Sequence, residues 1–242
     1  MSPKSWGLLM LLVLAAPLAQ AASGELDAYR LHSREALEQL QAERDGAGDS
    51  PRAQRDRAIL AVVRAPQDGL DEANVEVLAN YREQHPDDLY AKLYEGYGRL
   101  FSAGEYVKQQ NYFRAAELAK RGFFLMDEAV DQAPEDWRLH FLRARLDCYV
   151  PAEFGRHVVA LKDLRYLQEQ AASVPVELAP LGDFLRSRAL ARDGQDEQAR
   201  ALRQQLAGNP LWAAVLDQGD TRLFLTEAEI RYVLAPIVED GQ

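Results

Sequence analysis

Cysteine and histidine are both scarce in this chain of 242 residues. The single cysteine, Cys148, cannot form an internal disulfide, so we expect packing alone to stabilise the fold. The four histidines do not form the H-x-x-x-H or H-E-x-x-H spacing that places metal ligands on one face of a helix. We therefore predict no metal site and no cofactor.

The motifs of phosphate chemistry and acyl transfer are also missing from the sequence. The stretch GYGRLFSAG contains glycines, but it lacks the G-K-[ST] that would hold phosphate and Mg²⁺. There is no G-x-S-x-G motif to position a nucleophilic serine. We predict that the protein has no catalytic residues and is not an enzyme; an enzyme of unrecognised type is the least favoured alternative.

Positive charge is in deficit, with 28 lysines and arginines against 38 aspartates and glutamates, for a formal net charge of −10. A surface of this sign repels phosphate backbones and anionic lipid heads, so we expect no nucleic-acid partner. One basic cluster is interspersed with apolar residues, and we expect it to form salt bridges; a site for an anionic ligand is the alternative. The cluster consists of Arg138, Arg143, Arg145, Arg156 and Lys162.

Long apolar runs are rare, and the clearest lies near the start of the chain. Lys4 precedes an apolar run at 6–16, and Ala19-Gln20-Ala21 follows it as an A-x-A cleavage site. This run is shorter than the roughly 20 residues of a membrane span, and no cysteine follows it to carry a lipid. We predict a signal peptide at 1–21, cleavage after Ala21, and a periplasmic or secreted protein with no stable membrane insertion. An uncleaved membrane anchor is the alternative.

No stretch alternates apolar and polar residues as a strand does, whereas helical periodicity covers nearly the whole chain. We predict an all-α fold in which residues 22–242 form a single array of stacked antiparallel helical hairpins. The first three helices are expected around Leu26–Leu40, up to the residue before Pro66, and from an N-cap at Asp71 to Gln84. The others are expected at 88–103, 107–133, 136–149, 152–171, 177–193, 195–207, 211–217 and 226–238, the last with a capping box at Thr226 and Glu229.

The predicted helix at 88–103 carries two adjacent apolar stripes. At 100° per residue, one stripe is aromatic, and the other contains Gly96. Two such stripes suit a helix packed between two neighbours, and Gly96 would allow a neighbouring backbone to approach closely. We expect the aromatic stripe to be core or, as the alternative, to line a binding groove. Its residues, our candidate binding residues, are Tyr90, Tyr94, Tyr97 and Phe101.

The stretch DCYVPAEFGRHVVALKDL, at 147–164, concentrates reactive residue types around one proline. Pro151 suits the first position of a new helix, where Glu153 would face the positive end of the helix dipole. Glu153 and His157 could then pair one turn apart. We interpret this stretch as a corner between two helices, with Cys148 as a small buried apolar residue. A metal site that would also use Asp147 is the alternative.

Part of the chain resembles the tetratricopeptide repeat, a helix-turn-helix unit of about 34 residues. The best match is 177–210, where Gly194 lies in the turn, Ala199 at the small position of the second helix and Pro210 just past its end. Asp183 and Arg203 depart from the pattern, because they stand where large apolar residues are usual. A second partial match uses Ala129, Pro134 and Ala144. The resemblance implies stacked helical hairpins with degenerate repeats.

Two classes of function remain open. The first is a binding or scaffold protein that holds a protein or peptide partner on its helical surface. The second is a helical accessory component of a solute transport system, similar in architecture and compartment to the T component of TRAP transporters. An open apolar groove would favour the first class, and a closed pocket with convergent polar groups would favour a small ligand.

Overall fold

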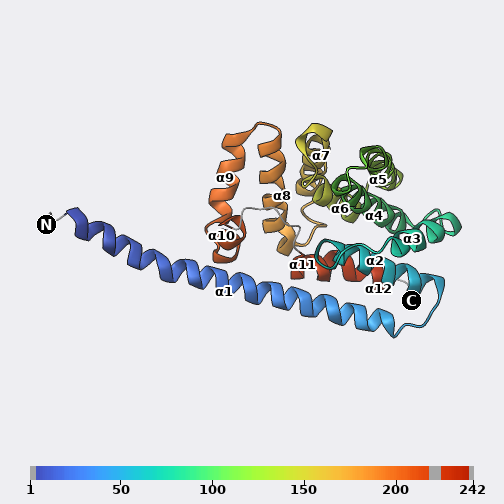
Figure 1. Cartoon of the computed structure of the whole chain (residues 1–242), viewed down its shortest axis with the longest axis horizontal. Coiled ribbons are helices and arrows are strands. Elements are labelled where there is room, and N and C mark those ends of the chain that lie inside the picture. Colours follow the sequence, from blue (N-terminus) through green and yellow to red (C-terminus); the bar gives the residue numbers. More distant parts are fainter. Residues whose placement is uncertain (1–3, 218–224, 240–242) are drawn as a thin grey trace.

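The structure, a computed structural model, describes the backbone of residues 4–217 and 225–239, and side chains from residue 26 onward. Within those ranges the fold is all-α and contains no strand (Figure 1). The first helices are α1 (Lys4–Asp45), α2 (Pro51–Asp68), α3 (Glu72–Gln84), α4 (Leu89–Lys108) and α5 (Tyr112–Gln132). They are followed by α6 (Trp137–Asp147), α7 (Arg156–Glu169), α8 (Ala179–Arg192), α9 (Asp196–Leu206) and α10 (Pro210–Asp217).

Three short elements complete the described chain after residue 224. They are α11 (Glu227–Glu229), the π-helix η3 (Ile230–Leu234) and α12 (Ala235–Glu239), and together with Leu225 and Thr226 we call them the C-terminal segment. The capping box predicted for this segment is confirmed. Glu229 N–H donates to Thr226 Oγ1 at 3.1 Å, and Thr226 N–H donates to the Glu229 carboxylate at 3.4 Å.

Aspartate and asparagine side chains fix where several helices begin. The predicted cap at Asp71 is confirmed, because its Oδ1 accepts from Ala73 N–H at 3.0 Å. Asp88 caps α4 by accepting from Ala91 N–H at 2.8 Å, and Asp136 caps α6 by accepting from Arg138 N–H at 2.9 Å. These bonds satisfy backbone donors that the first turn of a helix leaves unpaired.

Consecutive helices pack as hairpins: α2 with α3, α4 with α5, α6 with α7, and α8 with α9 (Figure 1). Glycines set the closest approach, as predicted for Gly96. A Cβ placed on Gly96 would lie 2.9 Å from the carbonyl oxygen of Gly122 on α5, and one on Gly122 would lie 2.8 Å from that of Gly96. On the other side of α4, a Cβ on Gly98 would lie 2.6 Å from a Val75 methyl on α3. Helix α4 is therefore packed between two neighbours.

Several predicted helix boundaries are wrong. Helix α2 continues through Pro66 to Asp68, because a proline in the last turn removes only one backbone hydrogen bond; the helix ends at Gly69, whose φ is +91°. Helix α4 continues through Gly104 to Lys108, rather than ending at 103. The chain turns at Gln110, with φ +60°, and Asn111 then caps α5, so this helix begins at Tyr112 rather than at 107 as predicted.

The stretch 147–164 is a corner, but its second helix begins later than predicted. A 3-10 turn, η1 (Ala152–Phe154), follows Pro151, and Gly155 takes the left-handed conformation with φ +68° before α7 starts at Arg156. This break leaves Glu153 exposed and outside the helix of His157. The predicted pair of Glu153 with His157 is replaced by an approach of His157 Nε2 to Asp193 Oδ1 at 3.5 Å.

Helix α1 passes along one side of the hairpins, and the C-terminal segment lies between it and them (Figure 1). Leu26, Leu37 and Leu40 are buried residues of α1. The predicted cleavage position after Ala21 falls within the backbone of α1, and that prediction stays a prediction. Across the described residues, none of the helices combines the length and apolarity that a membrane crossing requires.

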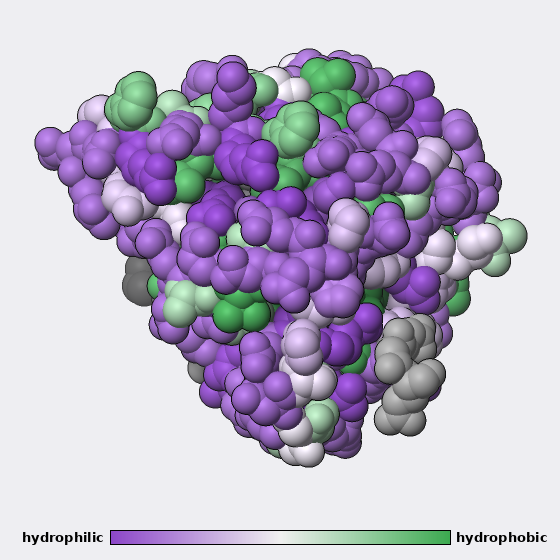
Figure 2. Space-filling model, turned by 90° about the vertical axis from the view of Figure 1, so that its right-hand side faces the viewer, coloured by the Kyte–Doolittle hydropathy of each residue, from purple (hydrophilic) through white to green (hydrophobic). Residues whose placement is uncertain are grey.

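The face seen from the right-hand side of Figure 1 is mostly hydrophilic, with apolar residues as separate patches (Figure 2). The first and last hairpins also present polar residues outward. On α3 these include Glu76, Asn80 and Glu83, and on α9 they include Glu197, Gln198 and Gln204. Polar outer faces at both ends are what a stack of helical units requires in order not to extend by adding further copies.

Candidate functional site

The aromatic stripe of α4 runs from an open cleft into the core. Tyr94 and Tyr97 are buried, with 1% and 4% of their surface exposed, whereas Tyr90 and Phe101 are half-buried. The ring of Tyr97 packs edge-on against Tyr94 at 5.4 Å and against Phe101 at 6.1 Å between centroids. The structure therefore divides the four candidate residues into a covered part and one ring, Tyr90, that lines a cleft.

Hydrogen bonds hold two tyrosines of this stripe in different ways. Tyr97 OH donates to the backbone carbonyl of Leu142 on α6. Tyr90 OH donates to Asp136 Oδ2 at 2.6 Å, so the residue that caps α6 also holds the ring at the cleft. Burial raises the pKa of both phenols, and the Asp136 carboxylate raises that of Tyr90 further. Both hydroxyls are therefore donors at neutral pH.

The C-terminal segment covers the rest of the stripe. We call the surface beneath it the inner groove. The apolar side chains of the segment lie at helical spacing and are buried: Ile230, Val233, Leu234, Ile237 and Val238. Of these, Val233 and Leu234 face the inner groove. The inner groove is formed by Val63, Gln67, Tyr94, Tyr97, Phe101, Leu142 and Arg145. A cavity of about 20 Å³ remains between groove and segment, which is room for about one water.

A buried ion pair joins the segment to α6. Arg145 binds Glu229, and both residues are less than 5% exposed. Burial raises the pKa of Glu229, and the charge of Arg145 offsets part of that rise. Removing either partner would leave an unpaired charge in the core, which is costlier than the pair itself is stabilising.

Proline creates a second attachment point on α6. Pro236 has no N–H, so it cannot donate to the carbonyl of Tyr232 one turn earlier. Around this position the segment widens into the π-helix η3, where Ala235 N–H donates to Ile230 O. Arg138 Nε donates to Tyr232 O at 3.2 Å and supplies the missing partner.

Three arginines bind the far end of the segment, where the last carbonyls of a helix lack intrahelical donors. Arg44 of α1 donates to Val238 O at 3.0 Å. Arg52 and Arg55 of α2 donate to Ile237 O at 3.1 and 2.8 Å. Together with Arg138 and Arg145, five arginines from α1, α2 and α6 hold the C-terminal segment.

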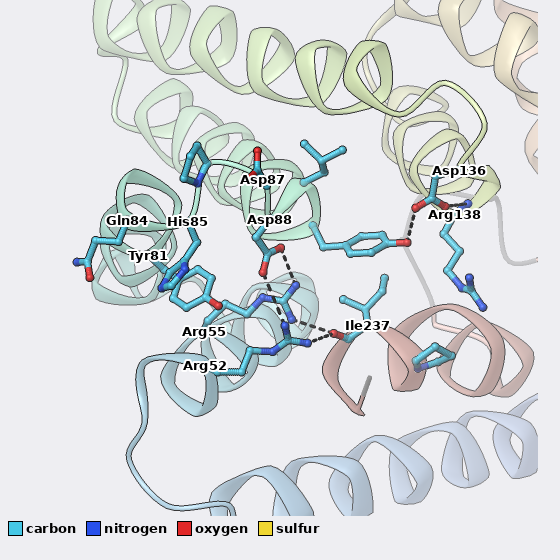
Figure 3. A pocket seen from close by; sticks show the side chains of 14 residues that line it. Arg52, Arg55, Tyr81, Gln84, His85, Asp87, Asp88, Asp136, Arg138 and Ile237 are labelled. Carbon is cyan, nitrogen blue, oxygen red and sulfur yellow. Dashed lines mark hydrogen bonds and ion pairs between the residues drawn. The ribbon is translucent and has the colours of Figure 1, made fainter. Parts of the chain in front are cut away.

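Beside this end lies the polar cleft, an open hollow of about 640 Å³ (Figure 3). Arg52 and Arg55 meet Asp88 at its centre, where Arg55 Nη2 donates to Asp88 Oδ1 at 2.9 Å. Arg55 is 1% exposed, and its Nε has no hydrogen-bond partner among the described residues. The remaining lining includes His85, Asp87, Tyr90, Asp136, Arg138, Pro236 and Ile237.

The lining of the polar cleft is rich in hydrogen-bonding side chains. Its described lining contains no serine, threonine, cysteine or lysine, and the ring of its histidine, His85, stacks on Tyr81 at 4.3 Å. Three arginines, three aspartates and two tyrosines line the cleft. Such a lining can accept a polar or charged group by hydrogen bonding.

Other charged residues that the sequence analysis singled out form ion pairs within the fold. Arg143 forms a two-bond pair with Asp163, and Arg156 forms one with Asp147; both arginines also reach Asp127. Salt bridges are thus confirmed for Arg143, Arg145 and Arg156. The alternative of a metal site in this corner loses one of its carboxylates, because Asp147 pairs with Arg156.

Cys148 is fully buried beside this network, and its Sγ lies 3.3 Å from Leu185 O. Burial raises the pKa of its thiol, which keeps it protonated. The structure therefore gives Cys148 the role of a small buried residue, and the thiol is not accessible for an intermolecular bridge.

Sequence reasoning singled out the aromatic stripe but missed the segment that covers it. The available signal was the spacing of Ile230, Val233, Leu234, Ile237 and Val238, which matches one face of a helix. That spacing predicts a buried face, but it does not say against which helices. Arg44, Arg52 and Arg55 were missed because their partners are backbone carbonyls 182 to 194 residues away.

By fold and site, this is an all-α protein of packed helical hairpins, with its own C-terminal segment seated along one side and an open polar cleft beside it. No protein-family model, no curated protein and no solved structure matches the chain.

Proposed function

We propose that this is an exported, periplasmic, non-catalytic binding or scaffold protein. In this proposal, residues 22–242 are a helical array similar to a tetratricopeptide-repeat solenoid, and a protein or peptide partner is held on it. The observation that carries the proposal is the polar cleft at the open end of the aromatic stripe, where Tyr90 lies beside arginines of α2 and α6.

Physical chemistry favours a partner that inserts a polar group there. Aromatic and arginine side chains are the types that most often anchor partners at interfaces. Arg55 is already desolvated and held by Asp88 and Ile237 O, so a ligand need not order it. Tyr90 is likewise fixed by Asp136. The cleft is preorganised for binding.

Site-specific crosslinking in the native envelope tests this proposal. Gln84 is exposed and lines the cleft, and it can be replaced by a photoreactive benzoylphenylalanine. The matched control replaces Gln198, an exposed residue of α9 on another face. We expect a discrete protein adduct from position 84 only, weakened by Tyr90→Ala. Equal labelling at both positions, or none, would argue against a partner at the cleft.

The second candidate is an accessory component of a solute transport system that contacts a small ligand or a substrate-binding protein. The observation that favours it is the cleft volume of about 640 Å³, which falls within the range of small-molecule pockets. In this case the purified protein should gain thermal stability from a small solute, and that gain should be reduced by Arg52→Ala. A protein adduct without such a solute effect would favour the scaffold function.

A further inference from the structure

The C-terminal segment occupies the inner groove in the manner of a bound peptide. It contributes one amphipathic face, whose apolar residues include Ile230, Val233 and Leu234, and one carboxylate, Glu229, that meets a buried arginine. Amphipathic helices that lie in apolar grooves are a recurrent mode of peptide recognition. The inner groove is thus complementary to an amphipathic helix that carries one carboxylate.

The hairpins also have contacts of their own that do not involve the segment, although its apolar residues belong to the same hydrophobic core. Helices α4 and α5 cross at Gly96 and Gly122, and α6 is tied to α7 by the ion pair of Arg143 with Asp163. The segment is held differently, chiefly by a single apolar face, a buried ion pair and arginine bonds to carbonyl oxygens. A buried ion pair contributes little net stability, and the cavity beside it shows incomplete packing.

Charge complementarity determines which other helix could occupy the inner groove in place of the segment. In an acidic protein, Arg145 stands at the bottom of the groove with less than 5% of its surface exposed, and its partner is the carboxylate of Glu229. If the segment left, Arg145 would need another carboxylate at the same point. Tyr94 and Tyr97 would need apolar residues at the next turns. A competing helix must therefore begin with an acidic residue that apolar residues follow.

We propose that the inner groove binds a partner helix of this chemistry and that the C-terminal segment competes for the same place. The partner brings a glutamate or aspartate at the position of Glu229, and apolar residues at the spacing of Ile230, Val233, Leu234 and Ile237. This inference rests on the proposed binding function, and it adds the class of partner and a device that keeps the groove closed. The covered tyrosines then become contact residues when the segment leaves.

Hydrogen exchange on the unmodified full chain is the first test. We expect the amides of 230–238 to exchange at least about tenfold faster than the buried amides of α4, because the segment opens without global unfolding. Exchange of both regions at one common rate, set by global unfolding, would overturn the proposal. This measurement needs no variant and so does not depend on the folding of one.

Peptide binding is the second test, with a fluorescent synthetic peptide of residues 225–239 as the probe. In Glu229→Gln, Arg145 loses its carboxylate partner, so the peptide should bind this variant at least about tenfold more tightly than the wild type. The same peptide with glutamine in place of the glutamate at position 229 should not bind. Glu227→Gln, a matched change at an exposed residue of α11, should behave like the wild type.

Three results would overturn the proposal. One is a folded Glu229→Gln variant, judged by circular dichroism, that does not bind the peptide. Another is equal binding of the glutamate and glutamine peptides. The third is a dimer of either protein in gel filtration without peptide, which would make a second copy the occupant. A failure here together with a crosslink at position 84 would leave the polar cleft as the binding site, so the two proposals can be separated.

Discussion

At the scale of single residues, burial decides the role of the aromatic stripe. Tyr94 and Tyr97 are large side chains that are almost fully enclosed by α2, α6 and the C-terminal segment. Tyr90 belongs to the same stripe but faces the polar cleft. One row of aromatic residues therefore serves both packing and an open surface, which explains why its spacing alone leaves both interpretations possible.

Truncation of the covered rings should destabilise the protein strongly. Tyr94→Ala or Tyr97→Ala should lower the free energy of unfolding by about 2–4 kcal/mol, because each leaves a cavity. Tyr112→Ala is the control, since 64% of Tyr112 is exposed, and its effect should be within about 0.5 kcal/mol. Urea denaturation measures all three. Unchanged stability of the two buried variants would show that these rings are not packed as core.

The reactivity of Cys148 provides a second test at this scale. The thiol is buried and its pKa is raised, so both access and thiolate formation are unfavourable. A thiol reagent should label it slowly in native buffer and rapidly in denaturant. Labelling followed by mass spectrometry measures both rates, and fast native labelling would contradict the burial described here.

At the scale of helices, the crossing of α4 and α5 depends on two facing glycines. Gly122→Ala should destabilise the protein by about 1–3 kcal/mol, because the new methyl would lie 2.8 Å from the Gly96 carbonyl oxygen. Gly104→Ala on α4 is the matched control, as no atom lies within 4 Å of its Cβ position. It should stabilise the helix by up to about 1 kcal/mol. Thermal melts of the two variants should therefore shift in opposite directions.

The sequence predicts most helices because their signals are local. Caps at Asp71, Asp88 and Asp136 stand within three residues of the amides that they bind, and the capping box of Thr226 is equally short-range. The errors have local causes as well. Pro66 and Gly104 are weak helix formers that neighbouring helical residues tolerate, whereas Gln110, which does turn the chain, has no side chain typical of a turn.

The candidate site was predicted only in part because its contacts are not local. Periodicity identifies Tyr94 and Tyr97 as one face of a helix, and separately identifies Val233 and Leu234 as one face of another. Nothing in either pattern says that the two faces meet. The contacts of Arg52 and Arg138 are harder still to predict. Each arginine donates to a backbone carbonyl, which every residue has, so the sequence does not indicate which carbonyl it binds.

At the scale of the whole molecule, the predicted signal peptide determines which chain we expect to be the functional one. We predict cleavage after Ala21, because Ala19-Gln20-Ala21 follows a short apolar run that Lys4 precedes. Protein from the envelope fraction should therefore have the mass of a chain that begins at Ala22. Intact-mass spectrometry measures this directly. A mass that retains Met1 to Ala21 would support an uncleaved anchor instead.

The bond from Arg44 to the carbonyl of Val238 also has a consequence for folding time. It joins residues 194 positions apart, whereas each hairpin forms from helices that are neighbours in the chain. Local contacts form early, and distant ones wait for the intervening chain to be ordered, because closing a long loop costs conformational entropy. We therefore expect the hairpins to assemble first and the closure of α1 over the C-terminal segment to be the last and slowest event.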